Sequence, residues 1–388
     1  DPNSYGGLLW CLGLFDRPFT PPKLIVGTVR PRSIQAHAER LDLVQYAAHV
    51  SRPVHPDDPE VAIVGGGISG LAAARALSDH NIRVTVFDRG RTPGGRASTR
   101  VTGRQSFDHG AQYFTARDER FQRYVSSWVK DGIAARWQAR VGVAKHGAIE
   151  GKESAVARLV GVPGMNAIAR HLAADIHVES GVKVTRPRRV GSRWQLVDDR
   201  QTELGEFDIV IVATPPQQAA ALIADRSTLA EVLTRVRMRP CWAVMVGFEQ
   251  PLLIDYDALF VHDSPVGWAA RNSSKPQRPD GESWVLHATP EWSDHRRDST
   301  AEEVSKPLLK AFLEATGVDA GSVASIDAHR WLYSQAAEPL DVGCLWDAGN
   351  SIGICGDWCS GSRIEGAFLS GMAMAGRVLS HRLSRHGL

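Results

Sequence analysis

Short apolar runs that end in glycine-rich or proline-containing turns recur along the chain and predict the strands of a buried parallel sheet. The first run is Val61–Val64, and a helix-forming segment, Leu71–Leu77, follows it after a turn at Gly65–Gly70. A second run, Ile82–Phe87, comes directly after that helix. The order strand, turn, helix and strand is typical of a dinucleotide-binding unit.

The same pattern returns in two later parts of the chain. Asp208–Ala213 is almost entirely apolar and stops at Thr214–Pro216, where proline cannot continue a central strand. Ser351–Cys355 is a shorter run that ends at Gly356-Asp357, and a helix is predicted from about Glu365 to Arg382. We also expect a helix within Pro163–Ala174 and strands at Val182–Val184 and Trp194–Val197.

Between about residues 226 and 337 the pattern changes to alternating strands that are rich in aromatic residues. The candidates are Trp242–Phe248, Ala258–Val261 and Trp284–Thr289. Such alternation predicts an antiparallel sheet whose two faces differ. Thr300–Glu303 has the spacing of a capping box and predicts a helix towards Ala315, which Pro307 should kink or delay.

These patterns predict an α/β protein with two domains. A chain of 388 residues exceeds the usual size of a single domain. We assign residues 60–115, 160–225 and 338–388 to a discontinuous Rossmann-like domain, and residues 116–159 and 226–337 to an inserted substrate domain with an antiparallel sheet. Residues 1–59 form a separate, poorly defined N-terminal extension.

The extension is rich in proline, so we expect much of it to be irregular. Its apolar stretch, Leu8–Phe15, is far shorter than the roughly 20 residues that cross a bilayer. We therefore expect a patch that packs on the main body and no stable membrane insertion. A trimmed targeting segment and a piece added for expression are the alternatives.

Composition excludes several partners. Lysine and arginine number 45 and aspartate and glutamate 43, so the net charge of +2 gives no broad attraction for nucleic acid or an anionic membrane. The five cysteines are few and odd in number, which argues against a disulfide framework and favours a reducing cytoplasm. Cys355 and Cys359 are four residues apart without a second ligand pair, so we expect no metal.

The glycines at 65, 67 and 70 have the G-x-G-x-x-G spacing of a phosphate-binding turn. One glycine makes the tight turn, the second lets backbone N–H groups approach a pyrophosphate, and the third lets the helix pack closely on the strand. The phosphate then lies at a helix N-terminus, where the unpaired N–H groups favour an anion. Asp88 ends the second strand, at the distance along the chain that a ribose-binding carboxylate requires.

Two later loops add possible ligand contacts. Gly94 and Gly95 permit a close backbone approach, and Arg96 supplies a forked cation that suits phosphate oxygens, although a flexible basic loop has the same composition. Phe107–Phe114 combines glycine, polar groups and aromatic rings, as a loop facing a ring-shaped ligand or an ordinary turn beside the core would.

Taken in order, these segments resemble the flavoproteins of the amine-oxidase and para-hydroxybenzoate-hydroxylase fold. The resemblance rests on Gly65–Gly70, Asp88, Gly94–Arg96, Ala213–Pro215, Gly356-Asp357 and Ile364–Ala367. Within that superfamily the chain is similar to the bacterial renalase-like oxidases over about residues 60–385, in Asp108–Arg117, Asp263–Trp268, Ala270–Pro276, Trp284–Thr289, His329–Tyr333 and Cys355–Cys359. The extension departs from this family, whose first strand lies near the N-terminus.

The resemblance implies noncovalent FAD as the resident redox group. It assigns the pyrophosphate to Gly65, Gly67, Ser69 and Gly70, the adenosine ribose to Asp88, the phosphates to Arg96, adenine to Val184 and the ribityl-phosphate arm to Asp357. It places the flavin pyrimidine edge at Ile364, Gly366 and Ala367, and it adds Arg89, Gly95, Thr214 and Gly356 to the cofactor site.

The resemblance also implies a reaction, in which 2- or 6-dihydronicotinamide isomers of NAD(P)H give hydride to the flavin and O2 accepts the electrons as hydrogen peroxide. The protein then mainly positions the two rings. By resemblance we nominate Asn272, His287 and Trp331, with Arg271 and Tyr113 as further candidates. Judged by residue type alone, His287 and Trp331 are ordinary core side chains. The alternatives are a flavin oxidase of small amines and an FAD-binding interaction protein without turnover.

Overall fold

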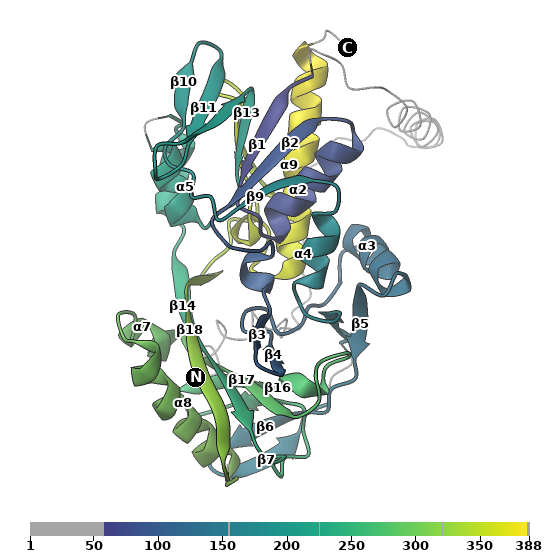
Figure 1. Cartoon of the computed structure of the whole chain (residues 1–388), viewed down its shortest axis with the longest axis vertical. Helices are drawn as coiled ribbons and strands as arrows, with labels where there is room; N and C mark the ends of the chain where they lie inside the picture. Colours follow the sequence, from purple (N-terminus) through teal and green to yellow (C-terminus); the bar gives the residue numbers. More distant parts are fainter. Residues whose placement is uncertain (1–57, 154–155, 225, 320, 386–388) are drawn as a thin grey trace, which may run out of the picture.

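The computed structural model describes residues 58–153, 156–224, 226–319 and 321–385. Its first sheet has six strands in the order β19-β20-β13-β1-β2-β9 (Figure 1). Five of them run parallel, namely β1 (Glu60–Val64), β2 (Arg83–Asp88), β9 (His177–Ser180), β13 (Ile209–Val212) and β20 (Ile352–Ile354). The edge strand β19 (Leu345–Asp347) pairs antiparallel with β20. This sheet is the predicted Rossmann-like sheet.

Side-chain alternation along β1 explains why both faces of this sheet are covered. Val61 and Ile63 pack into a core with α2 (Ile68–Asp79), α4 (Ala167–Leu172) and α9 (Ile364–Arg385). Ala62 and Val64 point to the other face, towards α5 (Pro216–Ile223) and the three-stranded sheet β10-β11-β12. Figure 1 shows these two groups of elements on opposite sides of β1. That small sheet consists of β10 (Arg188–Val190), β11 (Arg193–Val197) and β12 (Glu203–Phe207).

The second large sheet has seven strands in the order β18-β14-β17-β16-β15-β6-β7 and is antiparallel except where β15 pairs with β6. Its strands are β6 (Val141–Lys145), β7 (Ala148–Gly151), β14 (Met238–Phe248), β15 (Ala258–Val261), β16 (Val266–Arg271), β17 (Glu282–Ala288) and β18 (Val323–Ala336). Helices α7 (Pro290–His295) and α8 (Ala301–Thr316) lie on its outer side (Figure 1). The predicted antiparallel sheet is therefore confirmed.

Shorter elements connect the two sheets. They are the hairpin β3 (Arg100–Thr102) and β4 (Gln105–Phe107), helix α3 (Glu119–Lys130), the pair β5 (Ala134–Trp137) and β8 (Arg158–Gly161), helix α6 (Leu229–Thr234) and the 3-10 turns η2 (Gly95–Ala97), η3 (Asn272–Ser274) and η4 (Asp357–Cys359). Figure 1 shows β14 and β18 reaching from the lower sheet towards the upper one.

Two local predictions need correction. Val182–Val184 is not a strand, because only Val184 forms an isolated bridge, with Asp198. The predicted capping box at Thr300 and Glu303 is present, but α8 starts directly after it and continues past Pro307. A proline in the second turn removes one N–H, and the packing of Phe312 and its neighbours against the sheet outweighs that loss.

Some predictions stay open. The expectations for residues 1–57, including Leu8–Phe15, lie outside the described residues, and the ranges assigned to the two domains stay predictions. Within the described part of the chain, no helix is long and apolar enough to cross a membrane.

Helices α2 and α9 pack so closely that one glycine of α9 has no room for a side chain. A Cβ on Gly371 would lie 2.2 Å from the backbone oxygen of Ser69 in α2. A Cβ on Gly376, in the same helix, would meet no described atom within 4 Å.

We expect Gly371→Ala to destabilise the protein by about 1–3 kcal/mol, the usual cost of overpacking. Gly376→Ala should instead raise stability by about 0.5–1 kcal/mol, because it removes backbone freedom from the unfolded chain. Urea unfolding of both variants measures the difference, and equal effects would contradict the close contact of the two helices.

Candidate cofactor and substrate site

The glycine turn between β1 and α2 is shaped by contacts that exclude side chains. Gly65 has a φ of +117°, and a Cβ there would lie 2.7 Å from the Ala213 oxygen. A Cβ on Gly70 would lie 2.0 Å from the Gly65 oxygen. The turn and the helix–strand packing therefore require glycine at both positions, as the sequence predicts.

Gly67 is different, because the space beside it is open. It is the N-cap of α2, no side chain caps that helix, and its first turn holds no acidic residue. A Cβ on Gly67 would meet no described atom within 4 Å. Uncapped N–H groups beside open space fit a bound phosphate, and the residues present therefore fit a dinucleotide cofactor.

The Gly94–Arg96 loop lies directly against this turn. The Gly94 N–H donates to the Gly66 oxygen at 2.9 Å, and a Cβ on Gly95 would lie 3.3 Å from the Gly67 Cα. Two backbone segments thus border the same open space. Ser69 lies in the first turn of α2, and Thr214 lies beside Gly65 with its buried Oγ1 lacking a hydrogen-bond partner among the described residues.

Asp88 closes the far side of the turn at the end of β2. Its carboxylate accepts hydrogen bonds from the N–H groups of Gly66 and Gly90, each at 2.5 Å. Burial raises the pKa of this carboxyl group, although the two hydrogen bonds act to lower it. Val184 packs in the same core as the neighbouring Phe87, whereas Arg89 is exposed. The ribose, adenine and cofactor roles of Asp88, Val184 and Arg89 stay predictions.

Arg96 and Asp357 form a bidentate ion pair. Arg96 donates from Nη2 to Asp357 Oδ1 at 2.6 Å and from Nη1 to Oδ2 at 3.0 Å, and Nη1 also donates to the Ser334 oxygen at 2.8 Å. The structure thereby joins the predicted phosphate-binding loop to Gly356 and η4 and to the end of β18. The separate contacts predicted for Arg96 and Asp357 with the cofactor stay predictions.

The N-terminus of α9 is the third glycine-dependent segment. A Cβ on Gly366 would lie 2.0 Å from the Gly361 oxygen, so the chain turns tightly into the helix. Glu365 accepts hydrogen bonds at Oε1 from the backbone N–H groups of Arg117 and Asp118, at 2.6 and 2.8 Å. Ile364, Gly366 and Ala367 all lie in this first turn, and their contact with a flavin stays a prediction.

His287 and Trp331 meet on the backbone of the His109 loop. Trp331 donates from Nε1 to the His109 oxygen at 2.8 Å, and His287 Nε2 lies 3.2 Å from the same oxygen. The indole of Trp331 stacks on the His109 ring, with centroids 5.2 Å apart. Two of the nominated residues are thus close together, where β17 and β18 approach the loop that follows β4.

Tyr113 lies in a buried aromatic group on the same side of the sheet. Its ring is 5.7 Å from that of Trp268 and 6.3 Å from that of Trp137, and the Arg158 guanidinium lies 5.3 Å from the Tyr113 ring centre. Burial raises the pKa of the phenol, so Tyr113 stays protonated at neutral pH.

Asn272 and Arg271 are held by contacts with protein groups, and their roles at a substrate stay predictions. The Asn272 residue is 0% exposed, donates to the Ser106 oxygen at 2.7 Å and accepts from the Asp108 N–H at 3.2 Å. Arg271 donates to Glu282 and to the oxygens of Leu252 and Ile254.

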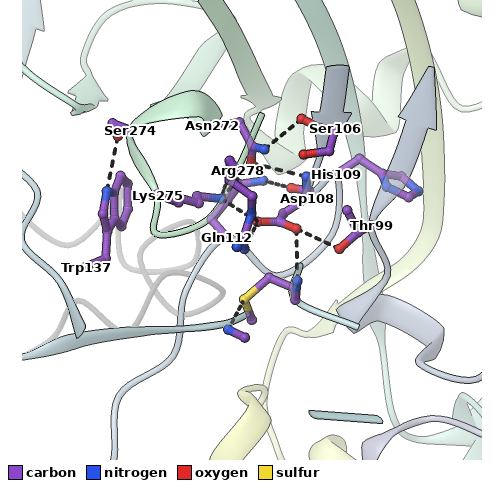
Figure 2. Close-up of polar contacts among 12 residues, drawn as sticks. Thr99, Ser106, Asp108, His109, Gln112, Trp137, Asn272, Ser274, Lys275 and Arg278 are labelled. Atoms are coloured by element: carbon purple, nitrogen blue, oxygen red, sulfur yellow. Dashed lines mark hydrogen bonds and ion pairs between the residues drawn. The ribbon is translucent and has the colours of Figure 1, made fainter. Parts of the chain in front are cut away.

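Sequence reasoning missed the charged group beneath the site. Asp108 forms ion pairs with Lys275 at 3.1 Å and Arg278 at 2.7 Å, and all three side chains are 0% exposed (Figure 2). Burial alone would raise the pKa of Asp108, but the two cations hold it at about 2. The spacing of Lys275 and Arg278 is visible in the sequence, but Asp108 lies 167 residues from Lys275 and 170 from Arg278.

Three histidines near Trp331 are uncharged at neutral pH. Burial lowers the pKa of His109 to about 3 and those of His287 and His329 to about 4, and Arg100 further opposes protonation of His109 and His329. The rings of His109 and His329 lie edge to face at 4.9 Å. An uncharged imidazole can accept or donate a hydrogen bond without attracting or repelling an ion.

Comparison with protein families identifies the class of protein. The model of the family described as "NAD(P)-binding Rossmann-like domain" matches residues 63–128, which hold the glycine turn and Asp88. The model of the family described as "Flavin containing amine oxidoreductase" matches residues 117–379, about two thirds of the chain. The chain belongs to the flavin-containing amine oxidoreductase family. Membership of this family implies FAD as the cofactor.

Curated relatives match the chain over short segments. Carotenoid phi-ring synthase of Streptomyces griseus is 52% identical over 42 residues, which cover 11% of this chain and 8% of that protein. Polyamine oxidase 4 of Oryza sativa subsp. japonica is 46% identical over 55 residues, which cover 14% of this chain and 11% of that protein. The chain thus matches only about a tenth of the length of these curated relatives.

Solved structures support the fold. The cyclohexylamine oxidase from Brevibacterium oxydans IH-35A superposes with a TM-score of 0.68 at 15% identity, covering 84% of this chain and 99% of that one. A putrescine oxidase bound to putrescine gives a TM-score of 0.64 at 13% identity, covering 83% and 99%. At such low identity these likenesses show the fold alone.

The open space beside Gly67 yields a test of the cofactor site. Gly67→Ala should fold normally, because the new Cβ meets no described atom and the residue's φ of −79° suits alanine. A clash with bound cofactor of about 1–3 kcal/mol should weaken FAD binding roughly 5- to 150-fold. Flavin content and the unfolding midpoint of the apoprotein are measured together, with Gly376→Ala as control. Full flavin content would contradict the site.

The three uncharged histidines predict a pH-dependent stability. Their folded pKa values lie below the ordinary 6.5, so between about pH 6.5 and 4 the unfolded chain binds more protons. Stability is therefore complete above pH 6.5 and falls as the pH drops towards 4. Urea unfolding between pH 7.5 and 4.5 measures the slope, which His109→Gln should reduce and substitution of the exposed His171 should not. An unchanged slope in His109→Gln would contradict the assignment.

Proposed function

We propose that this protein is an FAD-dependent oxidase that removes hydride from the carbon next to the nitrogen of a small amine. The C–H electron pair leaves as hydride, the nitrogen lone pair forms the C=N bond of the imine, and the N–H proton is released. FAD, when bound, accepts the hydride and returns the two electrons to O2, which becomes hydrogen peroxide. Membership of the flavin-containing amine oxidoreductase family supports this reading.

The proposal rests on the open space at Gly67. The Gly94–Arg96 loop joins this space to the His109 loop. Under this proposal one elongated cofactor has its phosphates at α2 and its ring beside His287 and Trp331. The residues would act by holding the donor carbon at reacting distance and by excluding water. With a pKa of about 4, His287 is too weak a base to take the proton of a substrate ammonium, so the amine reacts as its free base.

A dihydronicotinamide is the second candidate substrate, and the charge near the site favours it. Asp108 faces two buried cations, Lys275 and Arg278, so this group carries a net positive charge. Positive charge opposes a substrate ammonium and suits the phosphates of a 2- or 6-dihydroNAD(P) isomer. Such a ring becomes NAD(P)+ by losing hydride alone, without a base.

We further propose that the FAD is held without a covalent bond. Burial raises the pKa of the Cys355 thiol to about 12, and the pKa of Cys359 is raised by burial as well. Both residues are 0% exposed, so neither thiol offers a thiolate to the flavin.

Anaerobic stopped-flow reduction of the bound flavin tests the proposal with a panel of small primary amines, polyamines and dihydroNAD(P) isomers. Under the amine reading, at least one amine reduces the flavin at a rate that rises with pH, as the free base forms, and releases peroxide in air. Reduction by dihydronicotinamides alone would move the assignment to the second candidate. A flavin that no member of the panel reduces would contradict both and indicate a binding protein without turnover.

A further inference from the structure

The ammonium of Lys275 is completely buried and uses every hydrogen-bond donor it has. Its side chain is 0% exposed, and Nζ donates to Asp108 Oδ2 at 3.1 Å, to Gln112 Oε1 at 3.1 Å and to Asn272 Oδ1 at 2.9 Å (Figure 2). An ammonium has three N–H bonds, and each of them has one acceptor here.

Asp108 does not need this ammonium. Its carboxylate already accepts hydrogen bonds from Arg278 Nη2 at 2.7 Å, from Thr99 Oγ1 at 2.7 Å and from the Met165 N–H at 3.0 Å. A second buried cation beside one carboxylate costs desolvation, and burial together with Arg278 lowers the Lys275 pKa to about 8. The ion pair with Asp108 therefore does not by itself account for Lys275.

Gln112 is the residue that depends on Lys275. Among the described residues, Lys275 is the donor to Gln112 Oε1. Gln112 Nε2 donates to the Asp108 backbone oxygen and lies 3.4 Å from His287 Nε2. If the amide were reversed, its NH2 group would face the ammonium, donor against donor. Lys275 and the Asp108 backbone oxygen therefore hold the amide together, with its oxygen towards the ammonium and its NH2 group towards His287.

His287 Nε2 lies between two groups with opposite demands. The Gln112 NH2 group offers a proton, whereas the His109 oxygen, 3.2 Å away, would accept one. That oxygen already accepts from Trp331 Nε1 at the shorter distance of 2.8 Å. Within the described part of the chain no hydrogen bond reaches the other ring nitrogen, Nδ1.

We propose that Lys275 is a positioning residue that, by holding the Gln112 amide oxygen, turns the amide NH2 group towards His287 Nε2 and leaves the single imidazole proton on Nδ1. His287 then offers an N–H donor, rather than a lone pair, on the side away from Gln112. Its use to orient the substrate rests on the function proposed above. The low pKa of His287 is consistent with a ring that carries one proton at neutral pH.

Nitrogen-15 NMR of histidine-labelled holoenzyme tests the tautomer without any substrate. The two nitrogens of a neutral imidazole have widely separated shifts, and His287→Gln identifies the signals of His287. We expect a protonated Nδ1 in the unaltered protein and a shift of the proton to Nε2 in Lys275→Met, because the amide then keeps only its contact with the Asp108 oxygen and is no longer held against His287. Gln112→Met removes the amide without removing a charge and should give the same shift, which keeps the test usable if Lys275→Met does not fold.

Arg278→Met is the matched control, because it also removes one cation from Asp108 but leaves the contact of Lys275 with Gln112. It should lower the unfolding midpoint and leave the His287 tautomer unchanged. A protonated Nε2 in the unaltered protein would overturn the proposal. An unchanged tautomer in both Lys275→Met and Gln112→Met would overturn it too, as would an equal shift in Arg278→Met.

Kinetics supply the second arm, with the substrate that reduces the flavin fastest in the panel. The limiting rate of flavin reduction should fall on the order of tenfold in Lys275→Met and in Gln112→Met. The double variant should lose no more than either single variant, because both act on one contact. Additive losses would overturn the kinetic part. A flavin that no substrate reduces would contradict the proposed function while leaving the NMR result valid.

Discussion

The buried carboxylate of Asp108 is the contact on which the arrangement of this site depends. It is 0% exposed, yet it accepts from Arg278 and Lys275 of the segment after β16, from Thr99 and from the backbone of Met165. A carboxylate removed from water must be surrounded by donors, and these donors come from parts of the chain that are far apart. Satisfying one charge therefore locks the loop after β4 to the seven-stranded sheet.

The loop after β4 connects the segments of the predicted cofactor site with the seven-stranded sheet. Gly110 lies against the oxygen of Arg96, and Arg96 in turn grips Asp357 near the end of β20. On its other side the His109 oxygen meets Trp331 and His287. A displacement of the loop would thus move the Arg96 segment together with Trp331 and His287.

Charge is distributed unevenly around these contacts. The cations Lys275 and Arg278 lie beneath the loop, whereas the three imidazoles beside Trp331 are neutral because burial opposes their protonation. A site that is lined by uncharged histidines and lies close to two buried cations accommodates an uncharged or anionic ligand better than a cation. The choice between an amine and a dihydronicotinamide is consequently a question of electrostatics as much as of shape, although both share the loss of hydride beside nitrogen.

Local sequence determined the nucleotide-binding half of this protein: the apolar period of β1, the glycines at 65, 67 and 70, and the capping box of α8 act over a few residues, where propensity and steric exclusion decide the backbone. The resemblance of the ordered motifs to a known family predicted FAD and nominated His287 and Trp331 as residues of one site. Only tertiary structure decided that Asn272 is enclosed, that Arg96 meets Asp357, and that Lys275 reaches Gln112 from 163 residues away. Such pairings follow from how strands register across two sheets, and no short stretch of sequence encodes a distance between groups so far apart along the chain.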